Sequence, residues 1–195
     1  MDLQMPVTLK MGDLMSEEEF FQFCRMNDDT LEFERDSHGN IILLSLAGAF
    51  TGNLNSKVLA ELGIWNKKDQ LGKVFGSSTG FTLPNGAVRS PDVSWIRNER
   101  WNALSKEQQE GFAPLCPDFL IEIRSKSDDL KYLQDKMKEY IANGTSLGWL
   151  IDRFDNKVYI YRSDKSVEVH DSLHIVLSGE TVLPGFTLDL ASHLN

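Results

Sequence analysis

The sequence is poor in several features that mark specialised classes of protein. Only two of its 195 residues are cysteines, Cys24 and Cys116, which is too few for a disulfide framework or a four-sulfur zinc site. Both thiols are therefore expected to be reduced. No stretch approaches the ~20 apolar residues of a membrane-spanning helix. Residues 1–10 lack the basic start and apolar core of a signal peptide. These absences predict a cytoplasmic protein that does not bind membranes.

Basic side chains are also scarce. The chain has 20 Lys and Arg against 29 Asp and Glu, which gives a formal net charge of −9. Because affinity for a phosphate backbone comes largely from Lys and Arg, this balance counts against a protein that coats DNA. It leaves open an enzyme that holds a nucleic acid through metal ions and a local basic rim. The hydrophobic content of 41% and charged content of 25% are typical of one globular domain.

Local patterns predict an α/β protein of the α+β kind, with a mixed sheet and helices on its faces. Strand-like residues 31–35 and 41–46 are joined by turn-forming residues and indicate a hairpin. A strand–helix–strand unit follows later in the chain. It consists of a strand at 118–124, a helix at 128–143 capped by Ser127, and an apolar strand at 147–152. Antiparallel segments surround this unit, including a strand at 91–96.

Two further helices complete the predicted domain. One begins after Ser16, whose hydroxyl can cap it and which precedes three glutamates. The other covers residues 53–68, where apolar side chains recur every three or four positions, after an interruption at residues 48–52. Residues 1–15 are interpreted as a loose arm, and residues 16–195 as a single domain.

Two acidic residues, Asp92 and Glu122, lie on neighbouring predicted strands. Side chains alternate along a strand, so Glu122 points away from the face that carries Phe119, Ile121 and Ile123. Two buried carboxylates repel each other unless a cation lies between them. Mg²⁺ takes one or two carboxylates together with waters and phosphate oxygens. The pair therefore predicts a divalent-metal site. For Glu122 alone, a buried salt bridge with Arg124 or Lys136 is the alternative.

The order of these residues resembles a known signature. Ser90-Pro91-Asp92, followed by Glu122 within the strand 118–124, is similar to the PD-(D/E)xK nuclease motif. More specifically, the chain resembles the Uma-two family of restriction-endonuclease-like proteins from about residue 16 to residue 190. The stretches that carry this resemblance include Ser78-Thr79-Gly80-Phe81, Leu133-Gln134-Asp135-Lys136-Met137, Gly148-Trp149-Leu150-Ile151-Asp152 and Leu183-Pro184-Gly185-Phe186.

The resemblance implies a restriction-endonuclease-like core and hydrolysis of DNA phosphodiester bonds with Mg²⁺, or with Mn²⁺ in its place. It implies Asp92 and Glu122 as metal ligands, and Glu34 as a third acid, for which an exposed strand position is an equal alternative. Arg124 occupies the position of the motif lysine, and an arginine stays protonated and cannot act as a base. It can still position a water or neutralise charge. The lysine is then expected from the following helix, as Lys136. A homodimer is compatible with this class of enzyme, because both strands of a duplex must be cut.

Two other functions stay open. The missing motif lysine and the net charge of −9 also fit a non-catalytic module that keeps the fold and binds nucleic acid or protein. The run Gly76-Ser77-Ser78-Thr79-Gly80 fits the G-x-S-x-G elbow of serine hydrolases. That motif needs a strand before it and a helix after it. Because residues 81–84 are extended in character, Ser78 is expected in a turn, and a nucleophilic role for it is the weakest of the three hypotheses.

Overall fold

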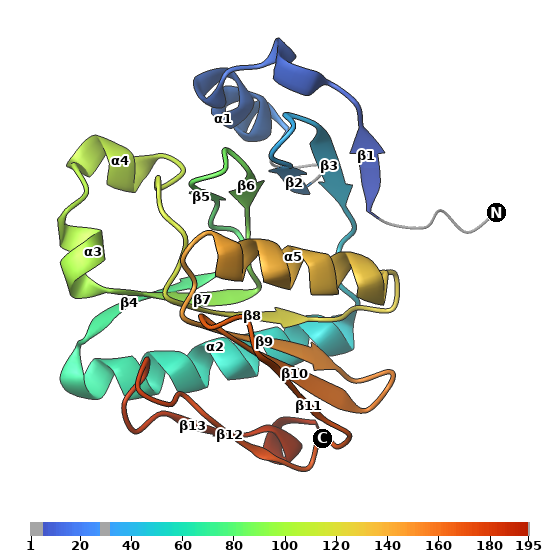
Figure 1. Ribbon diagram of the computed structural model, residues 1–195, viewed down its shortest axis with the longest axis vertical. Helices are drawn as coiled ribbons and strands as arrows, with labels where there is room; N and C mark the ends of the chain where they lie inside the picture. Colours follow the sequence, from blue (N-terminus) through green and yellow to red (C-terminus); the bar gives the residue numbers. More distant parts are fainter. Residues whose placement is uncertain (1–5, 28–31, 195) are drawn as a thin grey trace.

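The computed structural model describes residues 6–27 and 32–194, which form two main β-sheets with helices around them (Figure 1). The five-stranded sheet contains β1 (Val7–Leu9), β3 (Ile41–Leu44), β2 (Glu32–Arg35), β6 (Val88–Arg89) and β5 (Phe81–Thr82), in that spatial order. The six-stranded sheet contains β11 (Val167–His170), β10 (Lys157–Arg162), β9 (Leu147–Asp152), β8 (Phe119–Ile123), β7 (Val93–Arg97) and β4 (Gly72–Gly76), again in spatial order. A small hairpin of β12 (Val176–Ser178) and β13 (Thr187–Asp189) follows.

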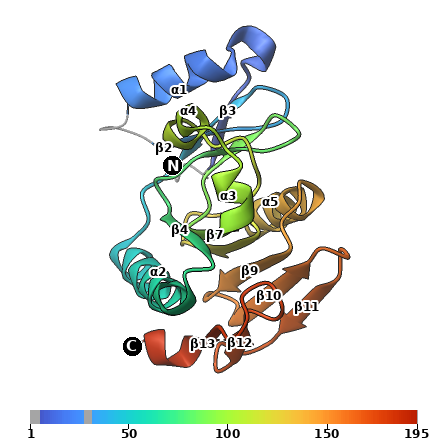
Figure 2. The same ribbon diagram turned by 90° about the vertical axis from the view of Figure 1, so that its left-hand side faces the viewer.

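Two long helices cover opposite faces of the six-stranded sheet (Figures 1 and 2). On one face, Leu54 and Val58 of α2 (Ala49–Asp69) pack in the same cluster as Trp149 of β9. On the other, Met137 of α5 (Leu130–Ala142) packs in the same cluster as Leu120 of β8. Each such side chain contributes roughly 1.5–3 kcal/mol when it is fully buried. The sheet is therefore fixed between two apolar layers.

The remaining helices are short or peripheral. They are α1 (Glu17–Met26), α3 (Asn98–Asn102), α4 (Lys106–Glu110) and the 3-10 turns Gly12–Leu14 and Leu190–His193. Ser16 caps α1 as predicted, because its hydroxyl accepts the Glu19 N–H in a reciprocal capping box. Within the described ranges, no helix has the length and apolar character needed to cross a membrane. Cys24 and Cys116 are both free thiols.

The pairing of strands confirms the mixed sheet and its central strand–helix–strand unit. Strands β8 and β9 are parallel and are connected through α5, whereas β7 and β8 are antiparallel. The hairpin of β2 and β3 is also confirmed. It belongs, however, to the five-stranded sheet rather than to the sheet that contains β8, so the chain has two main sheets where one was predicted.

Three boundaries differ from the prediction. The segment interpreted as a loose arm contains β1, in which Val7 pairs with Leu43 of β3, while residues 1–5 lie outside the described residues. Helix α2 begins at Ala49, because Gly48 takes the N-cap position and Gly52 continues the helix with no atom within 4 Å of where a Cβ would lie. Helix α5 is capped by Asp129, whose carboxylate accepts the Tyr132 N–H at 2.7 Å, and not by Ser127.

Candidate active site

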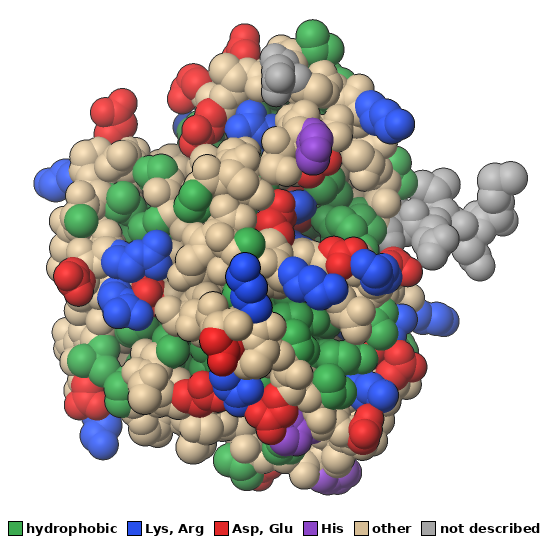
Figure 3. All heavy atoms as spheres, viewed as in Figure 1, with side chains coloured by type: hydrophobic (Ala, Val, Ile, Leu, Met, Phe, Trp, Pro, Cys, Tyr) green, Lys and Arg blue, Asp and Glu red, His purple; other side chains and the backbone are tan. Residues whose placement is uncertain are grey.

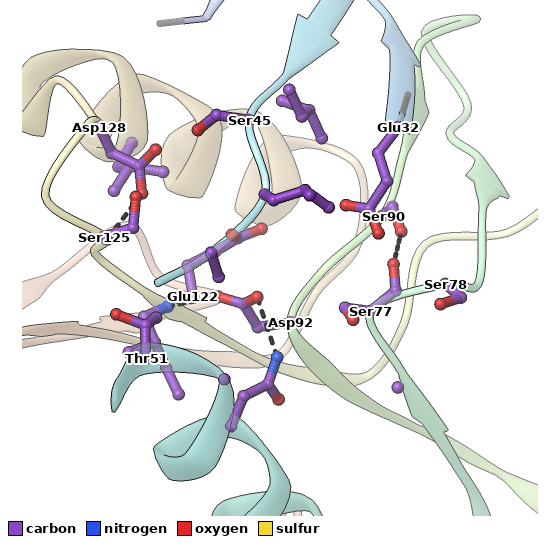
Figure 4. Close-up of a pocket in the computed structure, with 18 of the residues that line it drawn as sticks. Glu32, Ser45, Thr51, Ser77, Ser78, Ser90, Asp92, Glu122, Ser125 and Asp128 are labelled. Carbon is purple, nitrogen blue, oxygen red and sulfur yellow. Dashed lines mark hydrogen bonds between the residues drawn. The ribbon is translucent and has the colours of Figure 1, made fainter. Parts of the chain in front are cut away.

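A cavity of about 470 Å³ lies between the two sheets, where the start of α2 approaches β7, β8 and α5 (Figure 4). Its lining is acidic: Glu32, Asp92, Glu122 and Asp128 all contribute to it. Of the described residues that line it, Lys136 is the only lysine or arginine. Serines and threonines supply much of the rest of the wall. A polyanion would meet net negative charge here unless a cation were bound.

The geometry of the two strands brings Asp92 and Glu122 into this cavity. Val93 pairs with Ile121 across β7 and β8, and both side chains point into the core beneath α2. One residue further in the same register, Asp92 comes opposite Glu122, and the alternation of side chains turns both away from that core. Figure 4 shows the two carboxylates next to each other in the middle of the cavity.

Asp92 is held in a fixed orientation by two donors. Its Oδ2 accepts the N–H of Ile123 at 2.7 Å, and its Oδ1 accepts Nδ2 of Asn55 from α2 at 3.2 Å. Burial raises the pKa of Asp92 to about 6, although the Ile123 N–H opposes that rise. The fold therefore fixes the orientation of the Asp92 carboxylate, but the two groups that bind it are both uncharged.

Glu122 shares one lysine with a second buried acid. Nζ of Lys136 lies 2.8 Å from Oε1 of Glu122 and 2.8 Å from Oε1 of Glu34. The Tyr140 hydroxyl also donates to Oε1 of Glu122, at 3.1 Å. In the part of the chain that the structure describes, Oε2 of Glu122 accepts no hydrogen bond. Burial raises the pKa of Glu122 to about 8 even though Lys136 opposes the rise, so this carboxylate is short of positive charge as well.

Glu34 completes the network from the other sheet. It is fully buried on β2, where it also accepts Nη1 of Arg89 at 3.1 Å and the Ser90 N–H at 2.9 Å. Burial would raise the pKa of Glu34, but Lys136 and Arg89 outweigh it and hold that pKa below its ordinary value. Glu34 is therefore a buried anion that holds Lys136, and not an exposed strand residue.

The donor set suits a hard divalent cation. Asp92 and Glu122 are carboxylates with free oxygen lone pairs, and burial raises the pKa of both, an effect that a bound cation would oppose. Over residues 6–27 and 32–194, no three His, Cys, Asp or Glu side chains gather as a ready-made metal cage. A cation would thus depend on these two acids together with waters and substrate oxygens, which is the mode of binding common for Mg²⁺.

Arg124, the other candidate cation, is not brought into this cluster. Its Nη1 lies 2.8 Å from Oδ2 of Asp152 and 3.1 Å from Oδ2 of Asp155, and it is absent from the lining of the cavity. Sharing the alternation of β8 with Glu122 was not enough to bring Arg124 to the cavity, because its guanidinium pairs with Asp152 and Asp155 instead. Ser78 lies in a turn followed by β5, as expected, and lacks the helix of a nucleophile elbow.

Several contributors were not found from the sequence. Arg89 stands three residues before Asp92, and a charged residue at the end of a short apolar segment was the available signal. Asn55 gave no signal, because its contact with Asp92 depends on how α2 lies against the sheet. Glu32 and Asp128 also line the cavity; Asp128 stands just before α5, where an acid is common for the stability of the helix alone.

The raised carboxyl pKa values predict how the stability of the metal-free protein changes with pH. Both groups hold protons more tightly when folded, so their contribution is complete below about pH 4 and is lost as the pH rises through 6 for Asp92 and 8 for Glu122. The melting temperature in a chelator should therefore fall between about pH 5 and pH 9, and Glu122→Gln should flatten the upper part of that fall. An identical decline in the variant would contradict the assignment.

Comparisons with known proteins bear on the family and on the fold. The Uma2 family model, described as "Putative restriction endonuclease", matches residues 17–191. A crystal structure described as a putative nuclease belonging to DUF820, from Anabaena variabilis ATCC 29413, is similar to this chain with a TM-score of 0.71 and 20% sequence identity. The alignment covers 83% of this chain and 89% of that one, and at this identity it shows a shared nuclease-like fold. No protein of curated function matches this chain.

Proposed function

Since this chain belongs to the Uma2 family, we propose that it is a nuclease that hydrolyses DNA phosphodiester bonds with the help of Mg²⁺ or Mn²⁺. The observation that carries the proposal is the shared cavity of Asp92 and Glu122, with the Lys136 ammonium group 2.8 Å from Glu122. Paired acids beside a fixed lysine are suited to phosphoryl chemistry, in which positioning and electrostatic stabilisation supply most of the rate.

Asp92 and Glu122 are the residues that would hold the cation. Asp92 is oriented by Ile123 and Asn55, and Glu122 has its Oε2 free of hydrogen bonds from the described residues. When bound, the cation supplies Lewis-acid stabilisation of the charge that develops on the phosphate. Asn55 and the Ile123 N–H keep the Asp92 carboxylate in place before substrate arrives, so no reorganisation is needed during the reaction.

Lys136 acts as a fixed, charged donor rather than as a base. Burial alone would lower its pKa, but the Glu122 and Glu34 carboxylates outweigh burial and raise it above its ordinary value. The ammonium group therefore stays protonated at neutral pH. In this proposal it aligns the attacking water and donates to a phosphate oxygen, while Glu34, which is itself bound by Arg89, holds it in position.

The test is nicking of supercoiled plasmid by the purified full chain with Mg²⁺ or Mn²⁺. We expect Asp92→Asn and Glu122→Gln each to lower the rate by at least about 100-fold, the range seen when one catalytic group is removed. Asp135→Asn is the matched control, because Asp135 is an exposed acid on α5 that pairs with Lys131 and lies outside the cavity. Equal nicking by all four proteins would identify a contaminant and overturn the proposal.

A further inference from the structure

A stack of aromatic and cationic side chains lies beside the cavity, at the start of α2. The guanidinium carbon of Arg153 lies 4.7 Å from the ring centroid of Phe50 and 4.2 Å from that of Phe154. Phe50 is 45% exposed and Phe154 is 42% exposed, so both rings are open to solvent in part. We refer to Phe50, Arg153 and Phe154 as the Arg153 stack.

The Arg153 stack is continuous with the cavity wall. Ala47, Thr51 and Gly52 line the cavity on both sides of Phe50 in the sequence. On the other side of the stack, the guanidinium of Arg124 lies 5.7 Å from the Phe154 ring, and Arg124 directly follows Ile123, which also lines the cavity. A strand that leaves the cavity over the start of α2 would therefore meet the stack next.

Apart from its contacts with the two rings, the guanidinium of Arg153 is not used by the fold. Among the described residues its side chain forms no ion pair and no hydrogen bond, and its Nε is buried without a partner. The two nearest acids in the sequence, Asp152 and Asp155, are both bound by Arg124 at 2.8 and 3.1 Å. Arg124 thus neutralises the acids that would otherwise pair with Arg153. A guanidinium held between two rings and left without an acceptor is suited to a phosphate oxygen.

A second unpaired group lies where the stack meets the cavity. Thr51 is 3% exposed and lines the cavity, and its Oγ1 has no hydrogen-bond partner among residues 6–27 and 32–194. It stands in the first turn of α2, a helix of 21 residues whose N-cap is a glycine without a capping side chain. Gly48 therefore offers the backbone N–H groups of this turn no side-chain acceptor, and these groups add to the positive potential at the helix start. Both of these buried atoms without a hydrogen-bond partner belong to neighbours of Phe50: Thr51 follows it in the sequence, and Arg153 lies over its ring.

From these contacts we infer that the Arg153 stack and the first turn of α2 bind an unpaired DNA strand next to the scissile phosphate. This inference rests on the proposed nuclease function and names its substrate class. Arg153 pairs with a backbone phosphate, and the exposed rings of Phe50 and Phe154 stack against bases. Stacking of this kind needs the face of a base, which a continuous duplex does not offer.

The surroundings favour a strand over a duplex. Acidic and basic side chains are interspersed over the face shown in Figure 3, without the continuous basic surface that a duplex backbone requires. The net charge of −9 adds to the same argument. Local aromatic and guanidinium contacts supply affinity for a single strand without a continuous positively charged surface. The expected substrates are single strands, flaps and frayed ends.

The test is fluorescence anisotropy of a labelled oligothymidylate and of a labelled hairpin duplex of equal length, titrated with the full chain in Ca²⁺. The wild type should bind oligothymidylate more tightly than the duplex. Arg153→Ala should weaken oligothymidylate binding about tenfold, and Phe154→Leu by a similar factor, as expected for loss of one stacking contact. Arg153→Ala should also reduce the slope of log affinity against log salt by about 0.7, because one phosphate contact is lost.

The matched control is Arg25→Ala. Arg25 also lies over an aromatic ring, that of Phe21 at 6.0 Å, but on α1 and outside the cavity lining. It should leave binding within about twofold of wild type. The salt slope separates a lost phosphate contact from a merely weakened fold, and the exposed Phe154 allows the test even if Arg153→Ala fails to fold.

The outcomes distinguish this inference from the proposed function. Unchanged binding by both variants, tighter binding of the duplex, or no binding of oligothymidylate by the wild type would overturn the inference. If the plasmid is still nicked in an Asp92-dependent manner, the proposed function survives that result. Conversely, weakened oligothymidylate binding by Arg153→Ala in a protein that nicks no DNA would support the strand-binding site and overturn the nuclease proposal.

Discussion

Replacing Lys136 by methionine is expected to lower the rate of DNA cleavage by roughly 10²–10⁴-fold. Lys136 is 6% exposed, and its ammonium group lies 2.8 Å from both Glu122 and Glu34. It is also the only lysine or arginine among the described residues that line the cavity. Methionine fills a similar volume but donates no hydrogen bond. The substitution therefore removes the Lys136 ammonium group from beside the reacting phosphate.

Single-turnover cleavage at saturating cation is the appropriate measurement, because it reports the chemical step rather than product release. Lys131→Met is the matched control: it removes a lysine from the same helix, but one that is exposed and pairs with Asp135. Lys136→Arg adds a second comparison, since it keeps the charge while changing its geometry. Cleavage by Lys136→Met at nearly the wild-type rate would exclude the role proposed for this residue.

The second large effect concerns stability. Arg89→Met is expected to lower the free energy of unfolding by about 3–5 kcal/mol, the cost of removing one partner from a buried ion-pair network. Arg89 is 5% exposed and binds Glu34 at 3.1 Å and Glu139 at 2.6 Å. Glu34 is fully buried, so its carboxylate cannot turn to water once the arginine is removed.

Urea unfolding measures this change, with the midpoint and slope compared between variants. Arg162→Met provides a control of similar design, because Arg162 also bridges two acids, Glu168 and Glu180, both at 2.7 Å. That bridge lies at the surface, and its loss should cost only about 0–1 kcal/mol. Similar losses in the two variants would show that burial of the Glu34 network does not carry the stability assigned to it.

Short-range patterns were sufficient to predict most of the elements. The hairpin of β2 and β3, the apolar run of β9 and the cap at Ser16 depend on neighbouring residues, and the structure contains all three. The prediction for residues 1–15 was wrong, because it depended on a distant partner. Strand β1 forms because β3 offers an edge to Val7, and nothing within residues 1–15 reveals that edge.

The same distinction between neighbouring residues and distant partners applies to the residues of the candidate site. Alternation along β7 and β8 was enough to place Asp92 and Glu122 on one face, because both lie in regular strand geometry or one residue beyond it. It was insufficient at Arg124, because the acids that hold its side chain away from the cavity, Asp152 and Asp155, come from a later part of the chain. The partner of Glu34 could not be read from its own strand either, since Lys136 reaches it from a helix packed against another sheet.

The most direct test of the account is calorimetric titration of the full chain with Mn²⁺ at a pH above about 8, where Glu122 is ionised. The account predicts that the wild type and Asp135→Asn take up the cation at millimolar concentration or below, and that Asp92→Asn and Glu122→Gln lose this uptake. Equal uptake by all four proteins, or none by the wild type, would contradict the claim that Asp92 and Glu122 together bind one divalent cation.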